Sequence, residues 1–360
     1  MTAARHDAGD WGSVRIAPGS QGEVQVSVSE SYAGADIRIC VYVRRGPADG
    51  PCVFVTGAVH GDEINGTGAI RHLIVEQPVD LLRGTLVLVP VVNVLGFERH
   101  SRYLPDRRDL NRSFPGSSDG SLASRMARVI FDQIIRRCDY GIDLHTAAVR
   151  RTNFPNVRAD LSDATLAEFA RAFGTELIVS GPGPKGSLRR AASKAGCPTL
   201  ILEAGEIWKV EPTVVEYACR GVLNCLRHLG LVAGRPERPP YRIEADKTRW
   251  IRASNGGFLS FHVGPGDIVE RGDAIATSTS LLGQDQCLIE APRDGVVLGM
   301  TTLPTVAPGD PVCNLAYLKK GQLRRATAVR EALPDQSLHQ RAHEDLASSV
   351  FVSEVEEESV

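Results

Sequence analysis

The 360-residue chain lacks several features that mark special classes of protein. No apolar run approaches the roughly 18 residues of a membrane-spanning helix, and the first residues, "MTAARHDAGDWGS", contain no apolar segment typical of a secretory signal. The net charge of −2 disfavours a nucleic-acid partner, because phosphate binding needs a concentrated basic face. We therefore expect a cytoplasmic protein that binds neither membranes nor nucleic acids.

Paired cysteines are also missing. None of the eight cysteines belongs to a CxxC pair, and most stand in apolar runs such as "RICVYV" and "VLNCLRHL". This pattern is typical of reduced core residues and disfavours both disulfide bonds and metal binding by cysteine. The cysteines are Cys40, Cys52, Cys138, Cys197, Cys219, Cys225, Cys287 and Cys313.

Strands and helices alternate in the first two thirds of the chain. The runs "EVQVSVSES" and "DIRICVYVRR" predict paired strands, and "PCVFVTGAV" and "GTLVLVPVVN" are apolar enough for the centre of a sheet. Further strands are predicted in "YGIDLHT", "ELIVSG" and "PTLILEAG". Helices are expected at 66–76, 121–138, 161–173 and 213–229, with a short one in "GSLRRAASKAG". The alternation predicts an α/β fold, a sheet flanked by helices.

The composition changes at "GRPERPPYR", where proline and charge predict a linker. Beyond it, short β runs are broken by Gly-Asp and Pro-Gly turns, which predict an all-β unit. We expect an N-terminal segment with the first strand at 1–35, a catalytic α/β domain at 36–235, an all-β domain at 236–325 and an acidic, flexible tail at 326–360.

Two histidines and a glutamate follow the ends of predicted strands. His60 and Glu63 stand in "GAVHGDEINGTGAI", directly after "PCVFV", and His145 ends "YGIDLHT". The carboxyl edge of an α/β sheet is where sites form, and two imidazoles with one carboxylate and an open fourth position are the zinc pattern of hydrolytic sites. Asp143, two residues before His145, has two open interpretations: it orients a metal ligand or it is structural.

A polar string, "SRYLPDRRDLNRSFPG" (101–116), lies between these residues. One interpretation is a folded turn in which a guanidinium and an amide grip a carboxylate, and the other is a solvated loop. Arg102 could face the metal and stabilise charge on a carbonyl oxygen. Glu203 and Glu206 end the strand "PTLILEAGE", where a carboxylate beside a metal can act as a base toward water.

Together and in this order, HGDE at 60–63, DLNRSFPG at 109–116, DLHT at 143–146 and LEAGE at 202–206 resemble the motifs of the succinylglutamate desuccinylase/aspartoacylase family, relatives of zinc carboxypeptidases. The resemblance covers roughly residues 50–320. It implies a zinc-carboxypeptidase-like mixed β-sheet flanked by helices, one Zn²⁺ per chain and a small N-acylated substrate. The implied metal ligands are His60, Glu63 and His145.

The resemblance also implies the roles of other residues in these motifs. Glu203 is implied to be the general base, with Glu206 close enough in the chain to be confused with it. Asn111 and Arg112 are implied to bind the substrate's carboxylate. Arg102 is implied to polarise the scissile carbonyl, and Arg107 or Arg108 could take its place.

The C-terminal unit resembles the barrel-sandwich fold of biotinyl and lipoyl carriers in "VGPGDIVERGDAIA" and "APRDGVVLGM". A carrier needs a modifiable lysine, and none lies between Trp250 and Leu318, so carrier function is disfavoured. In similar deacylases such a domain restricts access to the site, which favours small substrates. The segment "RRTNFPNVRAD" (150–160) is similar to the loop after the last metal ligand, where its arginines either read the acyl group or form solvated surface.

The leading hypothesis is a zinc-dependent hydrolase that cleaves the amide bond of a small N-acyl amino acid or related compound by metal-activated water. The nearest alternative is a metallocarboxypeptidase that acts on a peptide or an amino-acid conjugate. An alternative of another class is a non-catalytic metabolite-binding protein. The sequence leaves the assembly open and allows a homo-oligomer.

Overall fold

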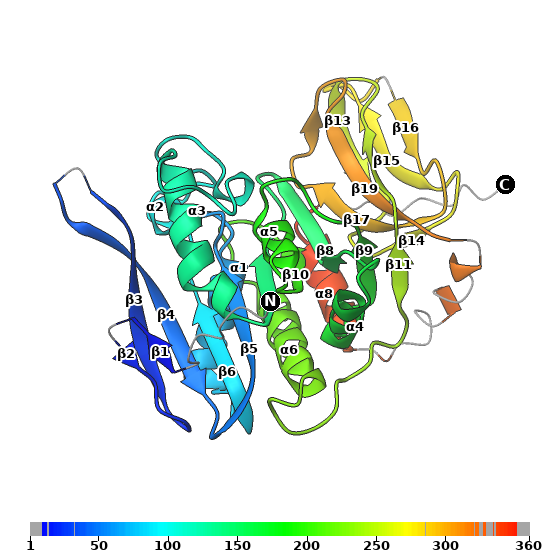
Figure 1. The fold of residues 1–360 in the computed structure, drawn as a ribbon. Coiled ribbons are helices and arrows are strands. Elements are labelled where there is room, and N and C mark those ends of the chain that lie inside the picture. The colour runs from blue at the N-terminus through cyan, green and yellow to red at the C-terminus, as the bar shows by residue number, and fades with distance from the viewer. Residues whose placement is uncertain are drawn as a thin grey trace.

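A long mixed sheet of 13 strands runs through the protein, flanked by helices over its first part and joined to smaller β elements at its far end (Figure 1). The computed structural model describes residues 9–350 except 13, 32, 285, 320, 324–326, 329–333 and 335. The strand order is β12-β19-β17-β8-β10-β7-β5-β6-β4-β3, and β9, β11 and β14 pair beside this path. A separate two-stranded ribbon is formed by β1 (Asp10–Trp11) and β2 (Val14–Arg15).

The predicted strands of the first part are present. Antiparallel β3 and β4 form one edge of the sheet, and their alternating burial fits a sheet with only one face covered. The neighbouring strands β5, β7 and β10 are parallel, so their carboxyl ends lie at one edge. The bounds are β3 (Gln21–Glu30), β4 (Asp36–Arg45), β5 (Ala48–Gly57), β6 (Arg83–Val89), β7 (Tyr140–His145), β9 (Leu177–Ser180) and β10 (Thr199–Gly205).

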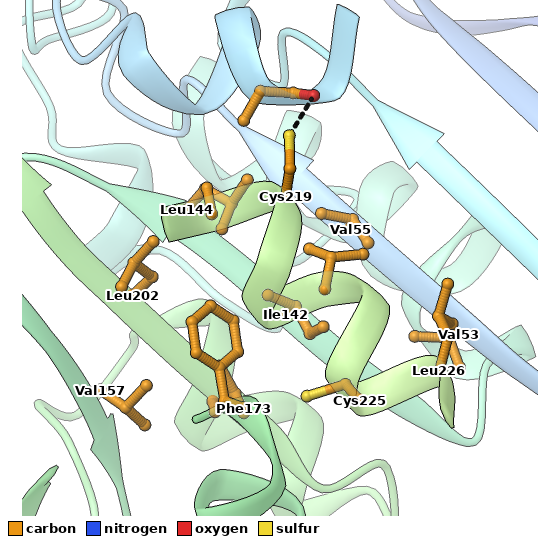
Figure 2. Packing of buried hydrophobic residues seen from close by; sticks show 14 of the residues in the cluster. Val53, Val55, Ile142, Leu144, Val157, Phe173, Leu202, Cys219, Cys225 and Leu226 are labelled. Atoms are coloured by element: carbon orange, nitrogen blue, oxygen red, sulfur yellow. Dashed lines mark hydrogen bonds between the residues drawn. The ribbon is translucent and has the colours of Figure 1, made fainter. Parts of the chain in front are cut away.

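Helices cover both faces of this part of the sheet. Successive residues of a buried strand point to opposite sides, so both faces carry side chains that must be covered. On one face α1 (Asn65–Arg71), α4 (Ala164–Phe173) and α6 (Pro212–His228) pack on the sheet. Figure 2 shows this layer, with Val53 and Val55 of β5 near Cys219 and Leu226 of α6. On the other face α3 (Leu122–Gln133) and α5 (Leu188–Lys194) cover Phe54. Within the described residues, no helix combines the length and the apolar character that a membrane span requires.

The C-terminal unit is all-β and continues the long sheet. Its strand β17 pairs with β8 of the α/β part, so the sheet passes through the boundary predicted near residue 236 without a break. A second, four-stranded sheet packs with the extension around an apolar cluster. The strands that extend the long sheet are β12 (Thr248–Arg252), β14 (Ile268–Val269), β17 (Gly295–Thr301) and β19 (Pro311–Tyr317). The second sheet consists of β13 (Gly257–Phe261), β15 (Ala274–Thr279), β16 (Gln286–Glu290) and β18 (Thr305–Val306). Strand β11 (Ile243–Ala245) pairs with β9.

Three sequence predictions need correction. The segment 150–160 is not a loop, because Arg151–Ala159 form β8 at the join of the two units; polar residues and Pro155 concealed the strand. The tail 326–360 is not flexible throughout, because α8 (Leu338–Ala347) buries Leu346 in the core. Residues 351–360 of that tail lie outside the described residues. All eight cysteines are free and six are buried as predicted, but Cys40 is exposed.

Candidate functional site

Three parallel strands bring the predicted site residues to one edge of the sheet. His60 and Glu63 follow β5, His145 is the last residue of β7, and Glu203 lies on β10 directly beside His145 in the register. The apolar residues of these strands are buried, on both faces for β5 and in the cluster beneath α1, α4 and α6 for β7 and β10, so the register is fixed by packing and the polar ends are held in place with it.

The turn after β5 lies against α2 (Val94–Phe97), and glycine is needed for this approach. A Cβ added at Gly61 would clash with the backbone of Gly96 and Phe97. Asn93 caps α2, since its Oδ1 accepts a hydrogen bond from the backbone N–H of Gly96 at 2.9 Å. The turn that carries His60 and Glu63 is therefore packed closely against α2, which restricts its backbone.

His60, Glu63 and His145 form a buried cluster that could hold a metal ion. One potential ligand atom from each lies within 4.8 Å of the others, and each residue is at most 4% exposed. His60 Nδ1 lies 2.7 Å from Glu63 Oε1, and His145 Nδ1 lies 2.8 Å from Glu63 Oε2. Two imidazoles and one carboxylate are a donor set that zinc prefers. The described part of the chain contains no second cluster of this kind.

Carboxylates on the far side of each ring turn both Nδ1 atoms toward Glu63. His145 Nε2 lies 2.8 Å from Asp143 Oδ2, and Asp143 Oδ1 accepts a hydrogen bond from Thr56 Oγ1 at 2.8 Å. His60 Nε2 lies 3.1 Å from Asp109 Oδ1. An Nε2–H that donates to a carboxylate leaves the Nδ1 lone pair for a cation, as is usual for metal-binding histidines. The donor set and its supports therefore fit a metal ion, and Asp143 lies where it can orient a ligand.

Electrostatics within the cluster favour an ionised Glu63. Burial alone would raise the pKa of Glu63, but the two imidazoles lower it well below its usual range. Burial would also lower the pKa of His145, but the carboxylates of Asp143 and Glu63 raise it well above its usual value. The pKa of His60 is raised by Glu63 and Asp109 against the effect of burial. A metal ion would replace the protons that these imidazoles otherwise bind.

Among the three candidate arginines of the 101–116 string, Arg102 reaches the cluster. Its Nη1 donates to Glu63 Oε1 at 3.1 Å and its Nη2 donates to Asp109 Oδ2 at 3.0 Å. Arg108 instead contacts Asp106 at the surface, and within the described residues neither Arg107 nor Arg108 lines the cavity beside the cluster. Of these three arginines, Arg102 is thus the one that lies beside the cluster and lines the cavity.

Glu203 and Glu206 have different surroundings. Glu203 lines the cavity, and its Oε2 accepts a hydrogen bond from Asn153 Nδ2 at 3.1 Å. Glu206 lies beyond the strand and forms an ion pair with Lys209 at 3.2 Å. Of the two carboxylates, Glu203 is the one placed to contact a molecule in the cavity.

Asn111 and Arg112 also line the cavity. They lie in a short 3₁₀ turn that begins at Asp109, whose Oδ1 accepts a hydrogen bond from the backbone N–H of Asn111 at 2.8 Å. Asn111 Oδ1 accepts from the backbone N–H of Leu188 at 2.8 Å, which ties the turn to the start of α5. The string is thus a folded turn, and its two candidate ligand-binding residues face the same space as Glu203.

The cavity has a volume of about 240 Å³ and is lined by five arginines, Arg102, Arg112, Arg151, Arg158 and Arg189. Arg189 is 7% exposed, and burial, followed by the charge of Arg158, lowers its pKa to about 10. Its Nη1 donates to Gly181 O at 3.0 Å, but no hydrogen-bond partner for its Nε is found among the described residues. A buried guanidinium so poorly paired favours an anionic ligand.

Sequence reasoning missed part of this lining. Arg189 lies in a predicted short helix that gave no sign of a site. Arg158 lies in the segment 150–160, for which both substrate binding and solvated surface were predicted as alternatives. Trp250 of β12 and Asn314 of β19 come from the C-terminal unit, and the ring of Trp250 packs on the guanidinium of Arg151 at 4.6 Å. No local signal marked these two residues, because their neighbours in space come from strands far away in the sequence.

A larger hollow of about 670 Å³ lies between α1 and α6. It shares no lining residue with the cavity beside the metal cluster, and none of the predicted site residues borders it. The chemistry of the chain is therefore concentrated at the smaller cavity.

Comparison with protein families supports the sequence resemblance. The model of the succinylglutamate desuccinylase/aspartoacylase catalytic domain matches residues 49–229, about half of the chain. The N-alpha-acetyl-L-2,4-diaminobutyric acid deacetylase of Halomonas elongata is 27% identical over 308 residues, which cover 82% of this chain and 90% of that protein.

Solved structures share the fold. A succinylglutamate desuccinylase/aspartoacylase from Rhodobacter sphaeroides is 25% identical, with a TM-score of 0.71, and the match covers 83% of this chain and 96% of that one. The product-bound ectoine utilization protein EutE (DoeB) from Ruegeria pomeroyi is 23% identical, with a TM-score of 0.73, over 85% of this chain and 98% of that one. These matches include both the α/β part and the C-terminal unit.

Proposed function

Because the chain belongs to the succinylglutamate desuccinylase/aspartoacylase family, we propose that it is a zinc-dependent deacylase that hydrolyses the amide bond of a small N-acyl amino acid. The observation that carries the proposal is the buried cluster of His60, Glu63 and His145 at a cavity that also contains Glu203. A zinc ion bound there would supply a Lewis acid and lower the pKa of a bound water toward about 7.

Glu203 acts as the general base in this proposal. Its carboxylate takes a proton from the attacking water as the new C–O bond forms at the amide carbon. It then gives that proton to the amide nitrogen as the C–N bond breaks, because an unprotonated amine is a poor leaving group. Asn153 holds one carboxylate oxygen and leaves the other for this proton transfer. The products are a carboxylate and a free amine.

Arginine side chains supply positive charge where the reaction needs it. The guanidinium of Arg102, held against Asp109, stabilises the negative charge that develops on the carbonyl oxygen. Asn111 and Arg112 bind the carboxylate of the substrate and hold the amide at the metal cluster. Arg158 and Arg189 add further positive charge to the cavity, which favours an anionic substrate over a neutral one.

The size of the cavity favours a small substrate over a peptide. At about 240 Å³, bordered by Trp250 and Asn314 of the C-terminal unit, it leaves little room for residues on both sides of a peptide bond. The Halomonas deacetylase makes N-acetylated 2,4-diaminobutyrate the first compound to try. The cytoplasmic location stays a prediction, and the assembly stays open.

A substrate panel tests the proposed function. Zinc-loaded protein would be assayed for amine release from acetyl, succinyl and longer-acyl amino acids, with short peptides in parallel. The proposal predicts turnover of at least one N-acyl amino acid and much slower turnover of peptides. Preference for peptides would establish the carboxypeptidase alternative. Tight binding without turnover of any compound would establish the non-catalytic one.

A further inference from the structure

One lateral row of residues crosses the join between the α/β part and the C-terminal unit. Asn153 of β8 pairs with Gly299 of β17, Gly299 pairs with Asn314 of β19, and Asn314 pairs with Trp250 of β12. Directly paired residues of neighbouring strands point to the same face of a sheet. Asn153, Asn314 and Trp250 all line the cavity, together with Glu203. The row is therefore one wall of the cavity, and both units contribute to it.

Asn153 of this wall lies closer to the carboxylate of Glu203 than the nearby Arg158 does. Its Nδ2 lies 3.1 Å from Glu203 Oε2, whereas Arg158 Nε lies 3.7 Å from Oε1. An irregularity in the pairing of β8 with β10 puts Asn153 opposite Gly205.

The position of Asn153 depends in turn on Gly299. A Cβ added at Gly299 would overlap Asn153 Oδ1 and would lie 2.7 Å from the backbone oxygen of Thr152. Gly299 is not among the glycines with positive φ, so space and not backbone conformation requires glycine here. Asn153 itself is 7% exposed and has little freedom to move elsewhere.

We propose that Asn153 is a positioning residue for Glu203 and that the C-terminal unit, through Gly299, sets where Asn153 lies. The inference rests on the proposed role of Glu203 as general base. The amide N–H of Asn153 fixes one oxygen of Glu203, which aims the other at the reacting water. The C-terminal unit thus has a part in turnover that goes beyond limiting access to the cavity.

Two substitutions at Asn153 test the donor. Asn153→Ala removes the side chain, and Asn153→Asp keeps its shape but replaces the donating nitrogen by an oxygen. Each should lower kcat about 10- to 100-fold, the size expected for a misplaced catalytic group, with a much smaller change in KM. Zinc content and melting temperature should stay near those of the wild type. Wild-type kcat in Asn153→Asp would overturn the proposal.

A double-mutant cycle tests the link through Gly299. Gly299→Ala should lower kcat, and Gly299→Ala combined with Asn153→Ala should be no slower than Asn153→Ala alone. If the fold-losses in kcat of the two single variants multiplied in the double variant, the methyl added at Gly299 would act on the backbone and not through Asn153. That result would overturn the link between Gly299 and Asn153. Gly256→Ala is the matched control, because its Cβ would meet neighbours only at 3.5 and 3.6 Å, and it should keep wild-type kcat.

A crystal structure of Gly299→Ala tests the geometry without an assay. The Asn153 amide is expected to have moved away from Glu203, and an unchanged contact would overturn the inference. If the wild-type protein hydrolysed none of the compounds, the proposed function would be contradicted. The crystal structure of Gly299→Ala would still show whether Gly299 determines the position of Asn153. An active wild type with fully active Asn153 variants would contradict the inference alone.

Discussion

The two units of the long sheet bury different kinds of side chain. In the α/β part, charged and titratable groups such as Glu63, Asp143, His145 and Arg189 are buried at the ends of strands and helices. In the C-terminal unit, the buried polar side chains among the described residues of strands β12–β19 are uncharged ones, Ser278, Thr301 and Asn314. The α/β part thus buries charged and titratable groups, whereas the described strands of the C-terminal unit bury only uncharged polar groups.

The largest effect should follow the loss of a proposed metal ligand. His145→Ala removes one imidazole of the cluster, so zinc content should fall well below one equivalent and hydrolysis should fall to the background rate. Metal analysis and an amine-release assay measure both quantities. His72→Ala is the control, because His72 is partly exposed and, in the described part of the chain, its ion pair is with Glu76 at the surface. Wild-type zinc content in His145→Ala would contradict the ligand assignment.

Glu203→Gln should separate chemistry from metal binding. The amide keeps the size of the side chain but cannot accept the proton, so kcat should fall about 10²- to 10⁴-fold while zinc content is unchanged. Glu206→Gln provides the comparison, since Glu206 pairs with Lys209 outside the cavity and its loss should leave kcat near the wild-type value. If the two variants lost the same activity, Glu203 would not be the base.

Much of this site was predictable because local chemistry marked it. His60 and Glu63 follow a buried apolar strand and His145 ends another, so the sequence predicted that one sheet edge would bring them together, as the structure does. Glu203 follows the same rule. The order of the four motifs along the chain also indicated the family, which the family model confirms.

The features of the fold and the cavity that were not predicted from the sequence depend mainly on contacts between distant segments. β8 contains Pro155 and few apolar residues in an alternating pattern, and its pairing with β17 joins residues almost 150 positions apart, which no local period reveals. Trp250 and Asn314 reach the cavity only because of that pairing. Helix α8 was missed because its apolar residues are few and lie in a polar segment.

A smaller effect is expected where positive charge is removed from the cavity wall. Arg189→Met should raise KM for an anionic N-acyl amino acid about 10-fold, in line with the loss of one charge-assisted hydrogen bond, and should change kcat less. The melting temperature should not fall, because a buried charge with few partners is replaced by an apolar side chain. The neighbouring Arg190→Met is the control. An unchanged KM in Arg189→Met would show that Arg189 does not contact the substrate.

The smallest of these effects concerns the support behind a ligand. Thr56→Val keeps the shape of a buried side chain but removes the hydroxyl that donates to Asp143 Oδ1. Zinc affinity should fall about 10-fold, at the lower end of what the loss of such a contact causes. Competition with a chelator measures the change. An affinity equal to that of the wild type would mean that Asp143 orients His145 without help from Thr56.

The proposed deacylase activity depends on a metal ion held by the His–Glu–His cluster. The most direct test measures amine release from N-acetylated 2,4-diaminobutyrate and from any better substrate that the panel finds. One preparation of the protein is assayed three times: as purified, after chelation of its metal, and after zinc is added back. A metal-dependent deacylase should lose hydrolysis on chelation and regain it with about one equivalent of zinc per chain. Full hydrolysis by protein with less than about a tenth of an equivalent of metal would contradict the proposed metal dependence.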